Sequence, residues 1–136
     1  MASRCALCKG DGGVLIWRNA DCRVVRADVD GYPGFLRVVF GRHVAEMTDL
    51  APAERDQLMH VVFAAERVLR ELCQPDKVNL ASFGNQVPHV HWHVIPRYRD
   101  DPHFPEPAWG TPQRKGAARA AVADVRLGTR LTELLG

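Results

Sequence analysis

His89-Val90-His91-Trp92-His93-Val94 alternates three imidazoles with three apolar side chains. Successive side chains of a β-strand point to opposite faces, so this alternation predicts a half-buried strand whose three histidines share one face. Neighbouring imidazoles repel one another when charged, which makes three in register a poor choice for an ordinary surface. Such a row suits a metal site, general acid–base catalysis or nucleophilic catalysis by a neutral imidazole. The residues alone leave these three chemistries open.

The segments around this motif predict a mixed fold. Short runs of β-branched and aromatic residues predict strands at 14–17, 22–26, 35–40, 77–82 and 87–95. Apolar residues recur at helical spacing over Pro52–Leu72, and Pro75 stops that helix. Five prolines between residues 96 and 112 indicate a loop, and a second helix is predicted to begin at Thr111-Pro112. We therefore expect an α+β fold, with a five-stranded antiparallel sheet, one long helix and a C-terminal helix.

Composition restricts the class of protein. The chain has 136 residues, of which 46% are hydrophobic and 25% charged, as expected for one ordinary globular domain. Its apolar runs are too short to span a membrane, and its net charge of +2 is spread along the chain, so neither a membrane nor a nucleic acid is the expected partner. Two cysteines precede the first apolar segment, which argues against a signal peptide and predicts a cytoplasmic protein.

The cysteines near the start form a Cys5-Ala6-Leu7-Cys8 pair. In a reducing compartment such a pair is compatible with a zinc half-site, a redox pair, or reduced thiols packed as small hydrophobes. Cys22 and Cys73 have no such partner in sequence and are expected in the core.

The motif around His91 is similar to the His-x-His-x-His-x signature of the histidine triad (HIT) family, and the resemblance extends to about Arg99. The other features that carry it, in the family's order, are Cys5-Ala6-Leu7-Cys8, Gly41-Arg42-His43, Met47-Thr48-Asp49-Leu50, the long helix, Asn79 and Ile95-Pro96-Arg97. Short bacterial members described as diadenosine-tetraphosphate-hydrolase-like are most similar. The resemblance implies a single HIT-like domain over 1–136, with a core over about 1–99 and a tail and helix over about 100–136.

The resemblance also implies an activity. It is that of a nucleotidyl hydrolase or transferase that cleaves at the α-phosphate of nucleoside phosphoramidates or dinucleoside polyphosphates, without a catalytic cofactor. His91 would attack the phosphorus and form a nucleotidyl-histidine, His93 would contact the same phosphate or the leaving group, and His89 would complete the catalytic set. An imidazole is largely neutral near pH 7, and a backbone carbonyl could fix its tautomer. The alternatives are a catalytically weak nucleotide-binding regulator and a zinc-dependent hydrolase with the triad as ligands.

The substrate-binding residues implied by the resemblance are Asn79, Gly84, Asn85, Gln86 and Val87. The turn departs from the family's usual Gly-Gln-Ser or Gly-Gln-Thr, but its amides can still donate to phosphate oxygens. The ribose-binding acid would be Asp28 or Asp30. Phe35 stands where many relatives have a histidine.

Two further expectations come from the resemblance. A structural zinc is expected on Cys5, Cys8, His43 and His89, which would form a closed four-ligand site with no open position for water. A homodimer joined edge to edge is also expected, with the tail around Trp109 near the partner's site.

Overall fold

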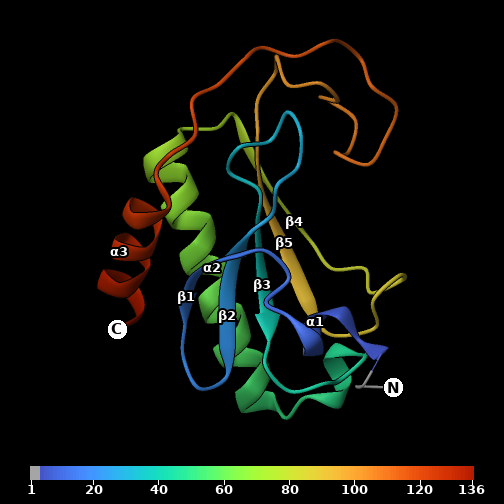
Figure 1. The fold of residues 1–136 in the computed structure, drawn as a ribbon, viewed down its shortest axis with the longest axis vertical. Helices are drawn as coiled ribbons and strands as arrows, with labels where there is room; N and C mark the ends of the chain where they lie inside the picture. Colours follow the sequence, from blue (N-terminus) through green and yellow to red (C-terminus); the bar gives the residue numbers. More distant parts are fainter. Residues whose placement is uncertain (1–3) are drawn as a thin grey trace.

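The computed structural model describes residues 4–136, and its centre is a five-stranded antiparallel sheet (Figure 1). The strands are β1 (Val14–Arg18), β2 (Cys22–Arg26), β3 (Leu36–Phe40), β4 (Lys77–Ala81) and β5 (His91–Arg97). Their order across the sheet is β1-β2-β3-β5-β4, so β5 lies between β3 and β4. The predicted α+β fold and five-stranded antiparallel sheet are confirmed.

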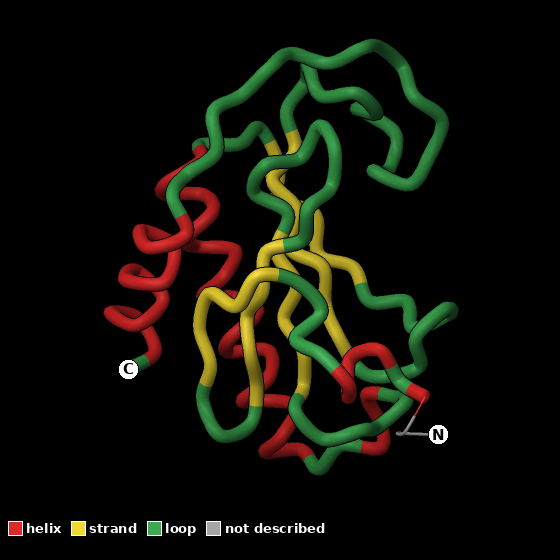
Figure 2. The backbone as a smooth tube through the Cα atoms, in the orientation of Figure 1, coloured by secondary structure: helices red, strands yellow, loops and turns green. Residues whose placement is uncertain are grey.

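The long helix α2 (Pro52–Cys73) packs along one face of this sheet (Figure 2). It matches the prediction of 52–72 to within one residue. Ala51 has no side-chain oxygen to cap the helix, but the Glu54 carboxylate accepts the Ala51 N–H at 2.8 Å. The helix ends where Gln74 adopts a left-handed backbone conformation, directly before Pro75.

The two faces of the sheet have different characters because side chains alternate along each strand. The face under α2 is apolar and fully buried; its main contributors are Val24, Leu36, Val38 and Val94 from the strands, and Leu58, Val62, Ala65, Val68 and Leu69 from the helix. The opposite face carries Arg37, His91 and His93. The largest apolar cluster therefore lies on the α2 side of the sheet. The other side carries the histidines and Arg37 beside smaller buried clusters that include Val25, Val39 and Ile95.

The predicted strand at 87–95 is wrong at its start, because regular pairing begins at His91, opposite Val39 of β3. Pro88 has no N–H to give to the sheet, and the His89 N–H donates to the Val87 carbonyl at 2.8 Å in a tight turn. Only His91 and His93 therefore share a strand face. His89 lies before the strand.

The C-terminal helix α3 (Asp124–Leu135) starts twelve residues later than its predicted cap at Thr111-Pro112 would require. Gly116 has a φ of +88°, and a Cβ added there would lie 2.8 Å from Pro102. The preceding segment is therefore held against the loop after β5 rather than in a helix.

Helix α3 packs against α2 and β1. At Gly128 the helix approaches the edge strand so closely that an added Cβ would lie 2.9 Å from the Ile16 carbonyl oxygen. Glycine at this position permits a contact that any side chain would obstruct.

Two short helical segments were not predicted, α1 (Ala6–Lys9) and a 3-10 turn at Met47–Asp49. None of the helices within residues 4–136 combines the length and apolar character that crossing a membrane requires.

Candidate active site

His91 is the first residue of β5, and its imidazole is buried. Its Nδ1 lies 2.6 Å from the carbonyl oxygen of His89. Because that oxygen can only accept, Nδ1 carries the proton, and the lone pair of the neutral ring is on Nε2. The Ser82 hydroxyl donates to the His91 carbonyl at 2.6 Å and ties the start of β5 to the end of β4. The His91 imidazole is thus held in one tautomer by a backbone group, as a nucleophile requires.

His93 lies two residues further along the same strand face, with its ring centroid 5.1 Å from that of His91. Its Nδ1 is buried and has no hydrogen-bond partner within the described residues. Burial, followed by the charges of His91 and Arg37, lowers the pKa of His93 to about 4. The ring is therefore neutral near pH 7. A buried nitrogen without a hydrogen-bond partner is rare in folded proteins, and this one is shielded by its neighbours.

Three aromatic rings enclose His93. The centroids of Phe35, Phe83 and Trp109 lie 5.6, 6.1 and 4.9 Å from its own. Trp109 reaches this position on the proline-rich loop after β5 of the same chain. Trp109 packs against the histidine of its own subunit, and the expected place of this tail near a partner's site stays a prediction.

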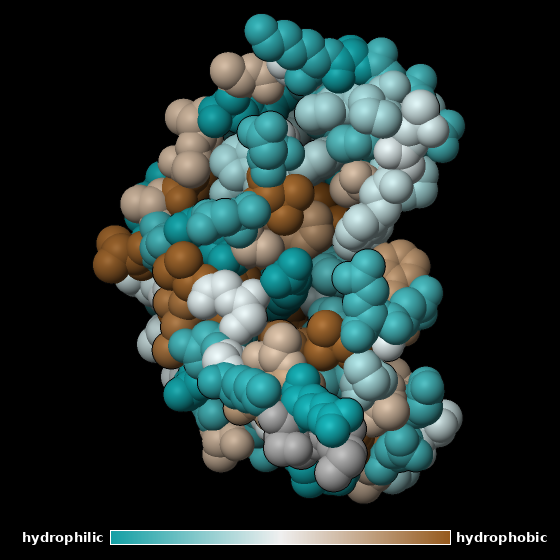
Figure 3. Space-filling model, turned by 45° about the vertical axis from the view of Figure 1, so that its right-hand side comes forward, coloured by the Kyte–Doolittle hydropathy of each residue, from teal (hydrophilic) through white to brown (hydrophobic). Residues whose placement is uncertain are grey.

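These side chains face a cavity of about 470 Å³. Its lining consists of Ala6, Leu7, Gly12, Arg37, Phe83, Gly84, Asn85, Gln86, Val87, His91, His93 and Trp109. The molecular surface is hollowed on the side where the loop after β5 overhangs the segments around α1 and the β4–β5 turn (Figure 3). The turn residues 84–87 inferred from the sequence thus share one cavity with His91 and His93. Arg37 and Phe83 were not singled out as site residues from the sequence, because no local motif marks them.

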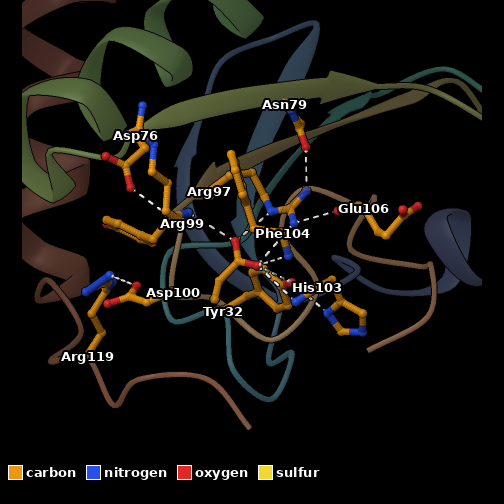
Figure 4. A network of polar contacts seen from close by, with 12 residues as sticks. Tyr32, Asp76, Asn79, Arg97, Arg99, Asp100, His103, Phe104, Glu106 and Arg119 are labelled. Atoms are coloured by element: carbon orange, nitrogen blue, oxygen red, sulfur yellow. Dashed lines mark hydrogen bonds and ion pairs between the residues drawn. The ribbon is translucent and has the colours of Figure 1, made fainter. Parts of the chain in front are cut away.

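Three predicted substrate-binding residues lie elsewhere. The Asn79 side-chain oxygen accepts a hydrogen bond from Arg97 at 2.8 Å (Figure 4), and Asn79 is not among the described residues that line the cavity. Asp28 forms an ion pair with Arg26 and, with Asp30, lines a separate surface depression. Asn79 and Asp28 are thus engaged by neighbouring arginines.

Cys5, Cys8, His43 and His89 form a second cluster in which the four candidate ligand atoms all lie within 4.8 Å of one another. His89 Nδ1 lies 3.4 Å from each sulfur and 3.3 Å from His43 Nδ1, and the Cys8 sulfur lies 3.3 Å from His43 Nδ1. A tetrahedron with zinc bonds of about 2.0–2.3 Å has edges of about 3.3–3.8 Å, so these separations fit the expected donor set.

The orientation of His89 also fits metal binding. Its Nε2–H donates to the Phe40 carbonyl at 2.5 Å, which leaves the Nδ1 lone pair directed at the two thiols. Burial lowers the pKa of His89 and favours the neutral ring that a metal requires. His89 therefore faces the cysteines, and its carbonyl faces His91.

Comparison with known proteins identifies the family. A model of the HIT domain matches residues 12–100. The chain belongs to the HIT family. It is 35% identical over 78 residues to an AP-4-A phosphorylase of Mycobacterium tuberculosis, a match that covers 53% of this chain and 40% of that protein. It is 32% identical over 74 residues to a bis(5'-nucleosyl)-tetraphosphatase [asymmetrical] of Schizosaccharomyces pombe, a match that covers 51% of this chain and 41% of that protein. The matched HIT segment thus spans less than half the length of these curated relatives.

Solved HIT structures share the fold of most of the chain. A histidine triad protein from Bradyrhizobium japonicum superposes with a TM-score of 0.69 at 28% identity, covering 91% of this HIT chain and 89% of that one. A zinc-bound histidine triad family protein from Mycobacterium smegmatis has a TM-score of 0.66 at 21% identity and covers 99% and 95%. The second likeness is evidence for the fold alone.

Proposed function

We propose that this HIT protein cleaves nucleoside phosphoramidates or dinucleoside polyphosphates at the α-phosphate, through a nucleotidyl intermediate on His91. The observation that carries the proposal is the 2.6 Å hydrogen bond from His91 Nδ1 to the His89 carbonyl, which leaves Nε2 free in a cavity beside His93. The names of the two curated relatives support a nucleotide hydrolase or transferase at the level of the family.

The proposed first step transfers the nucleotidyl group to the protein. The Nε2 lone pair of His91 forms a bond to the α-phosphorus, and the bond from phosphorus to the leaving group breaks, with its electron pair departing on that group. The ring becomes a cation that keeps its Nδ1 proton. The His89 carbonyl stabilises this cation through the hydrogen bond that already exists in the resting protein.

The second step releases the nucleotide. A water oxygen bonds to phosphorus, the nitrogen–phosphorus bond returns its electrons to Nε2, and the proton of the water leaves to solvent. His93 and the amides of Asn85 and Gln86 line the same cavity, and we expect them to contact phosphate oxygens.

The test measures nucleotide release from adenosine phosphoramidate and diadenosine tetraphosphate by wild type, His91→Ala and His60→Ala. His60 is an exposed histidine on α2 and serves as the matched control. We expect a loss of at least about 10³-fold for His91→Ala, no change for His60→Ala, and a nucleotidyl adduct in the mass spectrum of the wild type. Full turnover by His91→Ala would rule out His91 as the nucleophile.

A second candidate is a nucleotide-binding regulator without significant turnover. The placement of Trp109 against His93, together with the Asn85-Gln86 turn, favours this candidate. It predicts that AMP binds to the wild type while no substrate of the panel turns over in a His91-dependent manner.

We also propose that the cluster of Cys5, Cys8, His43 and His89 holds a structural zinc. The bound ion would tie the N-terminal segment to the residue before β5, and its four protein ligands leave no position for a substrate. Metal analysis is expected to find about one zinc per chain in wild type and in Cys73→Ser, and to find loss of zinc with a lower Tm in Cys5→Ser. Less than about 0.1 zinc per chain, with an unchanged Tm for Cys5→Ser, would contradict the proposal.

Two proposals concern context. We propose a homodimer joined edge to edge, which light scattering on the purified protein will test. We also propose a reducing, cytoplasmic setting, since the structure of residues 4–136 joins none of the four cysteines in a disulfide.

A further inference from the structure

Arg37 differs from the other residues of the cavity because it carries a permanent charge. It lies on β3 directly opposite His93 of β5, and its side chain is half-buried. Its guanidinium makes one hydrogen bond within residues 4–136, from Nη1 to the Gly12 carbonyl at 2.8 Å. Guanidinium has five N–H donors, so most of the donors of Arg37 are left for another partner.

A neighbouring arginine shows what a purely structural role looks like on the same face. Arg23 is buried and donates to three backbone carbonyls, those of Leu7, Gly10 and Asp11, at 2.6–3.1 Å. Arg37 has no such set of acceptors. It forms no ion pair with any described residue, although burial penalises its charged form and thereby lowers its pKa.

The described residues that line the cavity supply no negative charge to compensate Arg37. Among its twelve lining residues none is acidic, and the other polar members are the amides Asn85 and Gln86 and the imidazoles His91 and His93. A cavity with one arginine, two amides and no carboxylate is complementary to an anion.

The position of Arg37 indicates which part of an anionic substrate it meets. Val39, not Arg37, is the residue of β3 that lies opposite His91. Arg37 is one side-chain spacing further along the strand, about 7 Å away, on the His93 side. The backbone register thus places Arg37 opposite His93 rather than opposite the attacking His91.

We propose that Arg37 binds a phosphate of the leaving group, beyond the α-phosphate, and makes the protein selective for substrates with a polyphosphate chain. This proposal rests on the proposed function. Arg37 is a specificity residue under it, since a nucleoside phosphoramidate has no phosphate in that position.

The test compares two substrates and two charge-removing variants. Arg37→Gln is expected to lower kcat/KM for diadenosine tetraphosphate about tenfold or more, and to leave that for adenosine phosphoramidate within about twofold. Arg67→Gln removes the same charge from an exposed ion pair on α2 and is expected to change neither. Equal losses on both substrates would mean that Arg37 holds the attacked phosphate, and would overturn the proposal.

A binding measurement separates this proposal from the failure of the proposed function. Calorimetry with inorganic tripolyphosphate is expected to show binding to wild type and to His91→Ala, weakening about tenfold or more in Arg37→Gln. If tripolyphosphate binds in this way but no substrate turns over, the phosphate site at Arg37 is supported and the proposed hydrolysis is rejected. Tripolyphosphate binding that is absent from wild type, or unchanged in Arg37→Gln, would overturn the subsite.

Arg37→Lys covers the case in which Arg37→Gln does not fold. Lysine keeps the charge but lacks the planar pair of donors, so an intermediate loss on diadenosine tetraphosphate is expected, still without an effect on the phosphoramidate. An equal effect on both substrates contradicts the proposal here as well.

Discussion

Polar side chains are buried at both ends of β5, on the same face of the sheet. The two ends differ in how far the hydrogen-bonding groups of these side chains find partners. At one end Arg97 is 2% exposed and uses Nε, Nη1 and Nη2 for hydrogen bonds to Asp101, Asn79 and the Glu106 carbonyl (Figure 4). At the other end Arg37 has one hydrogen bond and His93 Nδ1 has none within the described chain.

The saturated end is a structural network. Asp101 receives hydrogen bonds from Arg97 and from the backbone N–H groups of Tyr98, His103 and Phe104. Burial alone would raise the pKa of Asp101, but these donors outweigh it and hold that pKa well below its usual range. The network fixes the start of the loop that carries Trp109. The comparison teaches that polar groups satisfied within the chain hold the fold at one end, whereas the unsatisfied ones lie at the proposed site.

The largest effect is expected from breaking the saturated end. Asp101→Ala leaves the Arg97 charge buried without its partner, and we expect a loss of about 3–5 kcal/mol in the free energy of unfolding, measured by urea denaturation. Arg37→Gln, which removes a charge from the open end, should cost far less stability. The double variant Arg97→Met, Asp101→Leu should recover part of the loss. A loss below about 1 kcal/mol in Asp101→Ala would show that the network is not structural.

Acid should affect the two ends in different pH ranges. The pKa of His93 is about 4 in the folded protein and about 6.5 in the unfolded chain, so the unfolded state binds more protons between these values. Its contribution to stability is therefore present above pH 6.5 and is lost as the pH falls toward 4. Asp101, whose folded pKa is depressed, contributes above its ordinary value near 3.8 and loses that contribution only as the pH falls below it.

The measurement compares wild type with His93→Phe by urea denaturation at pH 7 and pH 4. We expect wild type to lose about 2–3 kcal/mol more than the variant over this range. The comparison cancels the contributions of other groups that both proteins share. Equal losses in the two proteins would mean that His93 keeps an ordinary pKa.

A smaller effect is expected from Trp109→Ala. The indole is half-exposed but shields His93, so its removal should raise the pKa of His93 toward 6.5 and cost about 1 kcal/mol of stability. The His93 pKa can be followed by NMR titration of the ring. Phe63→Ala removes a similarly exposed aromatic ring from α2 and should leave that pKa unchanged. A constant pKa in Trp109→Ala would show that another group desolvates His93.

The sequence was sufficient wherever a local pattern decides the structure. The period of two in the strands and of 3.6 in α2 reflects burial on one face, and both periods are visible in neighbouring residues. The 84–87 turn and the Cys5–Cys8 pair were recognisable from their resemblance to family motifs. Where a tertiary contact overrides the local pattern, the prediction failed, as at Gly116 against Pro102.

The unpredicted parts of the site depend on contacts between distant segments. Arg37 reaches His93 only because β5 is inserted beside β3, a strand order that periodicity does not reveal. Trp109 returns to His93 on a loop that the Arg97–Asp101 pair anchors, and neither residue of that pair belongs to a local motif for such a role.

The close approach of Gly128 to Ile16 has a consequence for assembly symmetry. Each outer strand of a sheet offers unpaired backbone groups to another copy of the chain. The outer strands here are β1 and β4, and α3 already packs against β1. Edge-to-edge association of two copies would therefore use β4 of each, which is an isologous contact with a two-fold axis. In such a dimer the β4 edge of each copy is paired with the other, so no free edge is left for a third copy. A sheet with both edges open could instead add further copies and grow into a fibre.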